Sequence, residues 1–171
     1  MEKNINSRHN NQVTKGNRDD AFYRPCVGVI ILNPDGLVLI AQRIDKTSEA
    51  WQMPQGGIDE GEDAQTALHR ELLEEIGTNK INILHEYPEW LYYDLPEAIR
   101  PRLWKGRYNG QRQKWFLTRF TGNDTDINLE TEEPEFLSWR WEHPHNIVDL
   151  AVEFKQDIYR HLFSWLSSVS V

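Results

Sequence analysis

The segment from Glu60 to Ile76 constrains the fold of this chain more than any other. Its apolar residues Leu68, Leu72 and Ile76 recur every four positions, which is the spacing of one helix face. Gly77 follows directly, and glycine is the usual residue where a helix ends in a left-handed turn. The spacing therefore predicts a helix over 60–76 that packs an apolar stripe against a core.

Three carboxylates lie on a neighbouring face of the same predicted helix. Glu71, Glu74 and Glu75 are spaced at i, i+3 and i+4, so their side chains project close together. This arrangement costs stability unless a cation lies among the acids, and hard divalent ions prefer oxygen ligands. The pattern indicates a site for Mg²⁺, with Mn²⁺ as an alternative ion.

One base and two glycines accompany these acids. Arg70 lies eight residues after Glu62, and a salt bridge between them would fix the junction of loop and helix. A surface pair between Arg70 and Glu74 is the alternative, and it would contribute only about 0.2–0.5 kcal/mol. Gly56 and Gly57 precede the helix, where they either mark a turn or let the backbone approach a ligand and adopt positive φ.

The rest of the chain predicts strands and one further helix. The runs 27–32 and 37–40 flank Asn33-Pro34-Asp35-Gly36, a turn sequence, and together they predict a β-hairpin. Aromatic and aliphatic runs predict strands at 81–91, 113–121 and 136–141, and helical spacing recurs over 149–166. Because the order lacks a regular βαβ alternation, we expect an α+β fold with a mixed sheet between helices. The long irregular stretch 88–110 is a candidate functional loop.

Length and composition bound the domain organisation. The 171 residues suit one domain, which we place at 21–171, after a polar, flexible N-terminal tail at 1–20. No run of apolar residues is long enough to span a membrane. Cys26 is the only cysteine, so no intrachain disulfide can form, and we expect a cytoplasmic protein.

Charge is unevenly distributed along the chain. The net charge of −8 argues against broad nucleic-acid binding, so we expect neither DNA nor a membrane as a partner. Acids dominate residues 59–75, whereas residues 100–119 hold seven bases and no acid. Two such blocks suit a substrate that carries metal ions and phosphates, although two solvated surfaces would give the same pattern.

Residues 56–78 read GGIDEGEDAQTALHRELLEEIGT and resemble the Nudix box, G-x(5)-E-x(7)-R-E-U-x-E-E-x-G-U, where U is aliphatic. Thr78 alone departs from the pattern, at a position used for packing after the helix. The resemblance implies a Nudix hydrolase with the Nudix fold, a mixed β-sheet sandwiched between α-helices.

The same resemblance implies the catalytic groups. Mg²⁺ would neutralise phosphate oxygens and activate the attacking water, with Glu75 or a loop acid as general base. Arg70 and Glu62 belong to the implied catalytic set. The implied metal ligands are the carbonyl of Gly56 and the carboxylates of Glu71, Glu74, Glu75 and Glu135.

Segments outside the box resemble one branch of the family, the bacterial RNA pyrophosphohydrolases. That branch also contains dinucleoside polyphosphate hydrolases, including the invasion-associated type. It implies 5′-triphosphorylated RNA ends or dinucleoside tetra- to hexaphosphates as substrates, and for RNA a role in starting mRNA decay. The segments are 23–25 (YRP), 51–57 (WQMPQGG), 113–116 (QKWF), 134–136 (PEF) and 139–141 (WRW). The implied substrate-binding residues are Arg24, Arg43, Gln55, Gln111, Lys114 and Phe154.

Several alternatives remain open from the sequence. Phe154 lies on the apolar stripe of the last predicted helix, so core packing competes with base stacking. Glu135, Arg43 and Lys114 would be ordinary surface residues on composition alone. A Nudix hydrolase of another nucleoside diphosphate derivative and a non-catalytic binding module are the competing functions, although such a module would be expected to lose metal ligands. A monomer and a homodimer are both compatible with the sequence.

Overall fold

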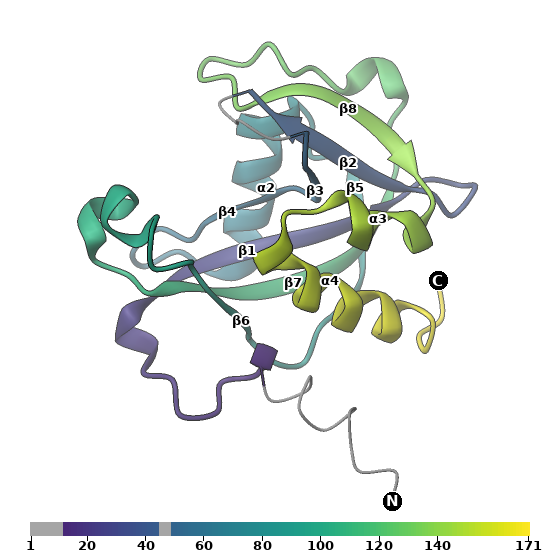
Figure 1. The fold of residues 1–171 in the computed structure, drawn as a ribbon. Helices are drawn as coiled ribbons and strands as arrows, with labels where there is room; N and C mark the ends of the chain where they lie inside the picture. Colours follow the sequence, from purple (N-terminus) through teal and green to yellow (C-terminus); the bar gives the residue numbers. More distant parts are fainter. Residues whose placement is uncertain (1–11, 45–48) are drawn as a thin grey trace, which may run out of the picture.

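The computed structural model describes residues 12–44 and 49–171 and has the predicted α+β architecture (Figure 1). Its centre is an eight-stranded sheet with the order β3-β2-β1-β7-β5, to which β4, β6 and β8 add at the sides. The long strands β1 (Tyr23–Leu32) and β7 (Gly110–Phe120) run parallel, and the other pairs are antiparallel. The prediction of a mixed sheet is therefore confirmed.

The remaining elements are short. The other strands are β2 (Val38–Arg43), β3 (Trp51–Gln52), β4 (Gln55–Gly57), β5 (Ile81–Glu86), β6 (Leu91–Asp94) and β8 (Phe136–Glu142). The α-helices are α2 (Ala64–Ile76), α3 (Pro144–Leu150) and α4 (Glu153–Leu166). The 3₁₀ turns are η1 (Asp20–Phe22), η2 (Arg100–Arg102), η3 (Trp104–Gly106) and η4 (Asp124–Asp126).

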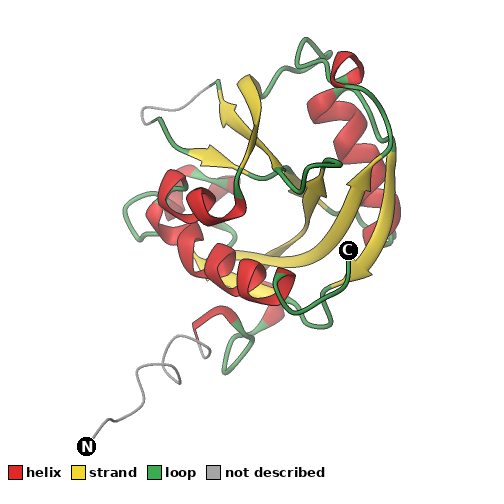
Figure 2. Cartoon of the chain, turned by 90° about the vertical axis from the view of Figure 1, so that its right-hand side faces the viewer, coloured by secondary structure: helices red, strands yellow, loops and turns green. Residues whose placement is uncertain are grey.

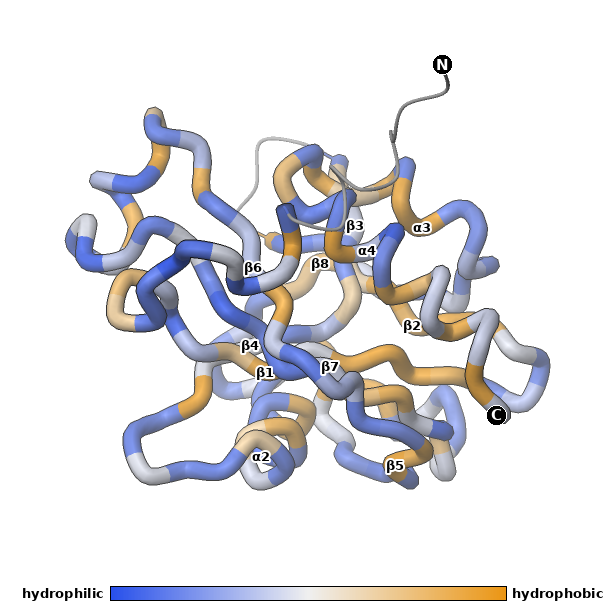
Figure 3. Tube along the Cα trace, turned by 90° about the horizontal axis from the view of Figure 1, so that it is seen from below, coloured by the Kyte–Doolittle hydropathy of each residue, from blue (hydrophilic) through white to orange (hydrophobic). Residues whose placement is uncertain are grey.

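Helices cover both faces of the sheet, and each face has its own core (Figure 2). Because side chains alternate along a strand, β1 supplies both cores. Val29 and Ile31 pack toward Leu68 and Leu72 of α2, whereas Ile30 packs in the core that α4 covers. Figure 3 shows the same layering, with hydrophobic stretches in the middle and polar loops outside.

Helix α2 confirms the predicted acidic helix but begins later than residue 60. Asp63 is its N-cap, and its side chain accepts a hydrogen bond from the backbone N–H of Thr66 at 2.8 Å. Gly77 ends the helix with φ of 75°, as predicted. Thr78 is 5% exposed, so the polar departure from the box pattern still fills a packing position.

Two predicted elements are each divided in the structure. The predicted strand 81–91 is two strands, because β5 ends at Glu86 and Pro88, which has no backbone N–H, lies in the break before β6. The predicted helix 149–166 is also two helices. The backbone is extended at Ala151 and Val152, which separates α3 from α4.

Residues 12–20, which the sequence places in a flexible tail, contact the domain. Val13 is 3% exposed and belongs to the core beneath α4. Arg18 forms a salt bridge of 3.0 Å with Asp94, and Asp20 accepts a hydrogen bond from the Tyr92 hydroxyl at 2.6 Å. One buried apolar residue and two polar contacts thus join this segment to the domain, and such isolated contacts leave no periodic pattern in the sequence. The rest of the predicted tail, residues 1–11, lies outside the described residues.

Within residues 12–44 and 49–171, no helix has the length and apolar character needed to cross a membrane.

Candidate active site

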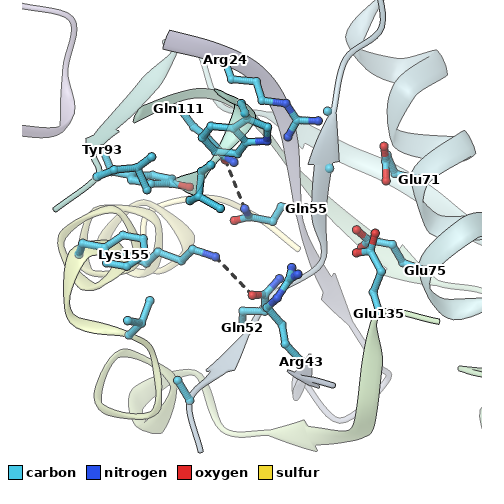
Figure 4. Close-up of a pocket in the computed structure, with 18 of the residues that line it drawn as sticks. Arg24, Arg43, Gln52, Gln55, Glu71, Glu75, Tyr93, Gln111, Glu135 and Lys155 are labelled. Carbon is cyan, nitrogen blue, oxygen red and sulfur yellow. Dashed lines mark hydrogen bonds between the residues drawn. The ribbon is translucent and has the colours of Figure 1, made fainter. Parts of the chain in front are cut away.

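A cavity of about 510 Å³ opens where both layers of the fold meet at one end of the sheet. Strand β4 and helix α2 form one wall, and β6, the start of α4 and the segment around η3 form the other. Figure 4 shows carboxylates on the α2 side facing cationic and amide groups on the opposite side. Ten of the lining residues are labelled there, namely Arg24, Arg43, Gln52, Gln55, Glu71, Glu75, Tyr93, Gln111, Glu135 and Lys155.

Three of the predicted acids form the acidic wall. Glu71 and Glu75 come from α2, and Glu135 comes from the loop before β8. The carboxylates of Glu75 and Glu135 point toward each other (Figure 4). Glu75 is only 3% exposed, and its Oε2 atom has no hydrogen-bond partner. Burial, followed by the charges of Glu135 and Glu71, raises the pKa of Glu75 well above its usual range.

These carboxylates fit a hard divalent cation. A buried carboxylate oxygen without a partner, close to a second carboxylate, is unfavourable unless a positive charge compensates it. Oxygen donors of this kind suit Mg²⁺ or Mn²⁺. Among residues 12–44 and 49–171, no three acidic, histidine or cysteine side chains lie close enough to enclose a metal ion. The acids would therefore have to draw together around one.

Glu74 does not line the cavity, unlike its neighbours on the helix. Its side chain is 58% exposed and accepts a hydrogen bond from Nη1 of Arg70 at 3.2 Å. The helix face predicted to carry three clustered acids thus holds two of them in the cavity wall, with the third beside Arg70.

The predicted salt bridge between Arg70 and Glu62 is present. Nε and Nη2 of Arg70 donate to the Glu62 carboxylate at 2.8 and 2.7 Å, and Nη2 also donates to the carbonyl of Gly57 at 2.8 Å. Arg70 also bonds to Glu71 at 2.9 Å. These contacts lower the pKa of Glu62 to about 2, chiefly through the hydrogen bond from Arg70. Arg70 therefore connects the loop, strand β4 and the acidic wall.

Gly56 and Gly57 are required for close approach rather than for a left-handed turn. Both lie in β4 opposite β1, and neither has positive φ, contrary to that part of the prediction. A Cβ atom on Gly56 would lie 2.1 Å from the Glu71 carboxyl carbon. A Cβ atom on Gly57 would lie 2.4 Å from Nη2 of Arg24. The two glycines let one acid and one base of the cavity pack against the strand.

The opposite side of the cavity carries three cationic residues. Arg24 and Arg43 were predicted from sequence, and both line the cavity. Lys155 was not predicted, because its position on α4 reads as part of a helix surface. It is 9% exposed, and its Nζ donates to Gln52 Oε1 at 3.3 Å. Burial, followed by the charge of Arg43, lowers the pKa of Lys155 to about 8.

A network of amide side chains forms the floor of the cavity. Nε2 of Gln55 donates to Gln111 at 3.3 Å, and Nε2 of Gln113 donates to Gln55 at 3.1 Å and to Gln111 at 2.9 Å. The indole N–H of Trp115 donates to Gln113 at 2.9 Å. The predicted substrate-binding residues Gln55 and Gln111 thus line the cavity in fixed orientations.

Aromatic rings surround the cavity mouth. Phe154 is half-buried, lines the cavity and lies 5.4 Å from the ring of Tyr93. It also packs against the core beneath α4, so both readings of this residue have structural support. Trp51 and Trp104 line the cavity as well, and neither was predicted as a site residue.

Lys114 does not line the cavity. Its Nζ lies 3.2 Å from Glu86 and 5.9 Å from the centre of the Trp90 ring. Along β7, Gln111 and Gln113 point to the cavity face, so Lys114, between Gln113 and Trp115, points to the other face. The alternation of side chains along this strand indicates that Lys114 points away from the cavity.

Comparison with known proteins agrees with the box and the fold. The family model described as NUDIX domain matches residues 22–166. A protein of Dinoroseobacter shibae named RNA pyrophosphohydrolase is 52% identical over 147 residues, which cover 85% of this chain and 92% of that protein. One of the same name from Rhodospirillum rubrum is 53% identical over 149 residues, covering 87% and 90%.

Solved structures share the fold at low identity. The dihydroneopterin triphosphate pyrophosphohydrolase of E. coli has a TM-score of 0.65 at 21% identity, covering 82% of this chain and 96% of its own. An Ap4A hydrolase of C. elegans has a TM-score of 0.62 at 22% identity, covering 85% and 99%. With the family model spanning nearly the whole described domain, the chain belongs to the Nudix hydrolase family.

Proposed function

We propose that this chain is a Mg²⁺-dependent pyrophosphohydrolase that converts 5′-triphosphorylated RNA ends to 5′-monophosphorylated ends. The observation that carries the proposal is the opposition of an acidic wall, suited to a cation, and a cationic wall, suited to phosphates, within one cavity. The names and coverage of the relatives from D. shibae and R. rubrum support RNA as the substrate.

The proposed metal ligands are the carbonyl of Gly56 and the carboxylates of Glu71, Glu74, Glu75 and Glu135. Bound there, Mg²⁺ would supply positive charge to the phosphate oxygens and help to activate water. Glu74 belongs to the proposed ligands because it lies one turn from Glu71 on the same helix and its side chain is exposed. Glu74→Gln should therefore lower kcat by orders of magnitude while leaving the fold intact.

The protein residues have separable tasks in this reaction. Arg24, Arg43 and Lys155 would hold the phosphate oxygens, because charged donors make the strongest hydrogen bonds to them. Water attacks a phosphorus atom of the α–β phosphoanhydride, the P–O bond to the bridging oxygen breaks, and the products are pyrophosphate and a 5′-monophosphorylated RNA. Glu75 or Glu135 would accept the proton of the attacking water, since their carboxylates face each other in the acidic wall.

Hydrolysis of dinucleoside polyphosphates is the second candidate function. The aromatic lining favours it, because Trp51, Tyr93, Trp104 and Phe154 offer more than one ring on which a nucleoside could stack. The second nucleoside of a dinucleoside polyphosphate would then occupy the position that the second nucleotide of an RNA substrate would occupy.

A side-by-side rate assay tests both candidates. Wild type and Glu75→Gln would be assayed with Mg²⁺ on triphosphorylated RNA and on diadenosine tetraphosphate. Glu60→Gln is the matched control, since Glu60 is an exposed acid of the loop before α2 that does not line the cavity. We expect higher kcat/KM on RNA, loss of turnover in Glu75→Gln and normal turnover in the control. Faster hydrolysis of the dinucleotide would favour the second candidate, and no turnover on either would favour a binding module.

A further inference from the structure

We propose that the segment from Leu95 to Asn109, here called the basic rim, binds the RNA backbone beyond the nucleotides held in the cavity. The inference rests on the proposed function and deepens it, because it assigns a surface that distinguishes an RNA chain from a dinucleoside polyphosphate. Figure 1 shows η2 and η3 of this segment as teal turns at the periphery of the molecule.

The basic rim is closed at its base and anchored to the domain. The backbone N–H of Leu95 donates to Asn109 at 2.8 Å, and that of Asn109 donates to Phe22 at 2.7 Å. Gly110 lies so close to β6 that a Cβ atom on it would be 1.9 Å from the carbonyl oxygen of Tyr93. Tyr93 and Gln111, at the two ends, both line the cavity. The basic rim therefore begins and ends beside residues that line the cavity.

The tip of the basic rim borders the cavity mouth. Leu103 and Trp104 line the cavity, and Cζ of Arg24 lies 5.1 Å from the centre of the Trp104 ring. Trp104 and Lys105 both have positive φ, 47° and 57°, which is unusual for residues other than glycine. This backbone conformation places the indole against Arg24, and it places the neighbouring basic residues on the exposed side of the rim.

Three cations of the basic rim are available to a ligand. Arg102, Lys105 and Arg107 are exposed, and none forms an ion pair within the described parts of the chain. Arg100 differs, because its Nε donates to the carbonyl of Leu95 at 2.8 Å. The basic residues elsewhere on the surface, such as Lys80 and Arg160, have acidic partners.

An RNA backbone fits this surface better than a second nucleoside does. The chain carries a net charge of −8, so an unpaired group of cations beside the cavity is a local exception. Repeated phosphates release counterions when they meet such cations, which gives affinity without base specificity. Trp104 and Tyr108 form an edge-to-face pair at 6.0 Å, and Cζ of Arg107 lies 5.0 Å from the centre of the Tyr108 ring, so these rings hold two arginines at the rim. A dinucleoside polyphosphate has no phosphate beyond its second nucleoside and would gain nothing here.

The test compares two charge variants on two RNA lengths. The rim variant is Arg102→Gln/Lys105→Gln/Arg107→Gln. The control variant is Lys15→Gln/Lys80→Gln/Arg160→Gln, which makes the same change in net charge at side chains that are 58%, 57% and 50% exposed and away from the cavity. Pyrophosphate release would be measured over a salt series with a triphosphorylated dinucleotide and with a longer unstructured triphosphorylated RNA.

We expect the rim variant to raise KM for the longer RNA by about tenfold at moderate salt, with kcat unchanged. The slope of log(kcat/KM) against log[salt] should become less negative by about 2, because each lost phosphate contact to a single strand removes about 0.7 from the slope. Kinetics on the dinucleotide should stay within about twofold of wild type, and the control variant should follow wild type throughout.

Two results would overturn the inference, and they are distinguishable. If wild type acts on both RNAs but the rim variant keeps the KM and salt slope of the control, the rim does not bind RNA while the proposed function stands. If wild type releases no pyrophosphate from either RNA, the proposed function fails, and the inference fails with it.

Discussion

The carboxylate of Glu75 is almost fully buried and faces that of Glu135, with one oxygen unpartnered. Such a group opposes folding, since burial and like charge both disfavour the ionised form. A chain selected only for stability would place an amide or an apolar residue here. The position is therefore best explained by a ligand that compensates the charge.

Glu75→Gln tests this interpretation. Without divalent cations the variant should melt at a higher temperature than wild type, because the repulsion is removed and the new amide can donate to Glu135. A gain of 1 kcal/mol would raise Tm by about 2–4 °C in a domain of this size. Turnover should be lost at the same time. Differential scanning calorimetry in EDTA measures the first effect, and a lower Tm in the variant would contradict it.

Phe154 combines a packing role with a place in the cavity lining. Phe154→Ala should raise KM and destabilise the fold by about 2 kcal/mol, less than the ~3–5 kcal/mol typical of a fully buried phenylalanine. Phe163→Ala is the matched control, because Phe163 is also half-buried on α4 against the same core but does not line the cavity. If both variants lose a similar free energy of unfolding in urea and only Phe154→Ala raises KM, Phe154 both packs and binds substrate. Equal KM values in both variants would assign Phe154 to packing alone.

At the scale of elements, the loop before α2 is held to the helix by ion pairs as well as by the packing of Ile58 against the core beneath α2. Glu62 is 12% exposed at its side chain, and it accepts from Arg70 and from the backbone N–H of Asp59 at 3.1 Å. Arg70 also bonds to the carbonyl of Gly57. One arginine thus fixes the relative positions of the loop, β4 and the acidic wall.

The stability supplied by this bridge should depend on pH. The pKa of Glu62 is lowered to about 2 in the folded chain, below its ordinary value, so the ionised form is favoured by folding. Ionised Glu62 therefore gives its full stabilisation above the pKa that it has in the unfolded chain. This stabilisation is lost as the pH falls through the lower pKa that Glu62 has in the folded chain. Glu62→Gln should be less stable than wild type near pH 7, and the difference should shrink progressively below about pH 5. Urea unfolding over a pH series checks this, and a constant difference would exclude the bridge as its cause.

Local spacing predicted the elements that depend on neighbouring residues, and missed those that depend on tertiary contacts. The clustering of the carboxylates of α2 follows from helical periodicity, and the Arg70–Glu62 bridge was predicted as a contact between the preceding loop and the helix. Lys155 enters the cavity only because the chain turns at Ala151 and Val152, a break without a proline or glycine to mark it. Trp104 reaches the cavity through an irregular turn whose conformation no periodic pattern specifies.

Lys114 differs from these residues, because the sequence itself contains the pattern that places it outside the cavity lining. The alternation of Gln111, Gln113 and Trp115 along one strand places Lys114 on the opposite face. The resemblance to the family implied Gln111 and Lys114 together, whereas a strand presents only every second residue to one face.

At the scale of the whole molecule, the cavity joins two layers that otherwise have separate cores. Glu71 and Glu75 of the acidic wall lie on α2, which covers one core, and Phe154 and Lys155 lie on α4, which covers the other. A ligand that bridges the acidic and cationic walls should therefore stabilise both layers together. The gain in the free energy of unfolding depends on the ligand concentration relative to its Kd for the folded state.

Mg²⁺ alone should raise the melting temperature of wild type in a saturable manner. At a concentration ten times Kd, the gain is about 1.4 kcal/mol, which corresponds to roughly 3–6 °C for a domain of this size. Glu75→Gln should lose most of this shift, because the buried charge that the cation compensates is gone, whereas Glu60→Gln should retain it. Thermal denaturation over a Mg²⁺ titration, with Na⁺ at matched ionic strength, measures the effect without any substrate. Identical shifts in both variants would mean that the cation binds the surface acids of the loop, and the assignment of the acidic wall as the metal site would be wrong.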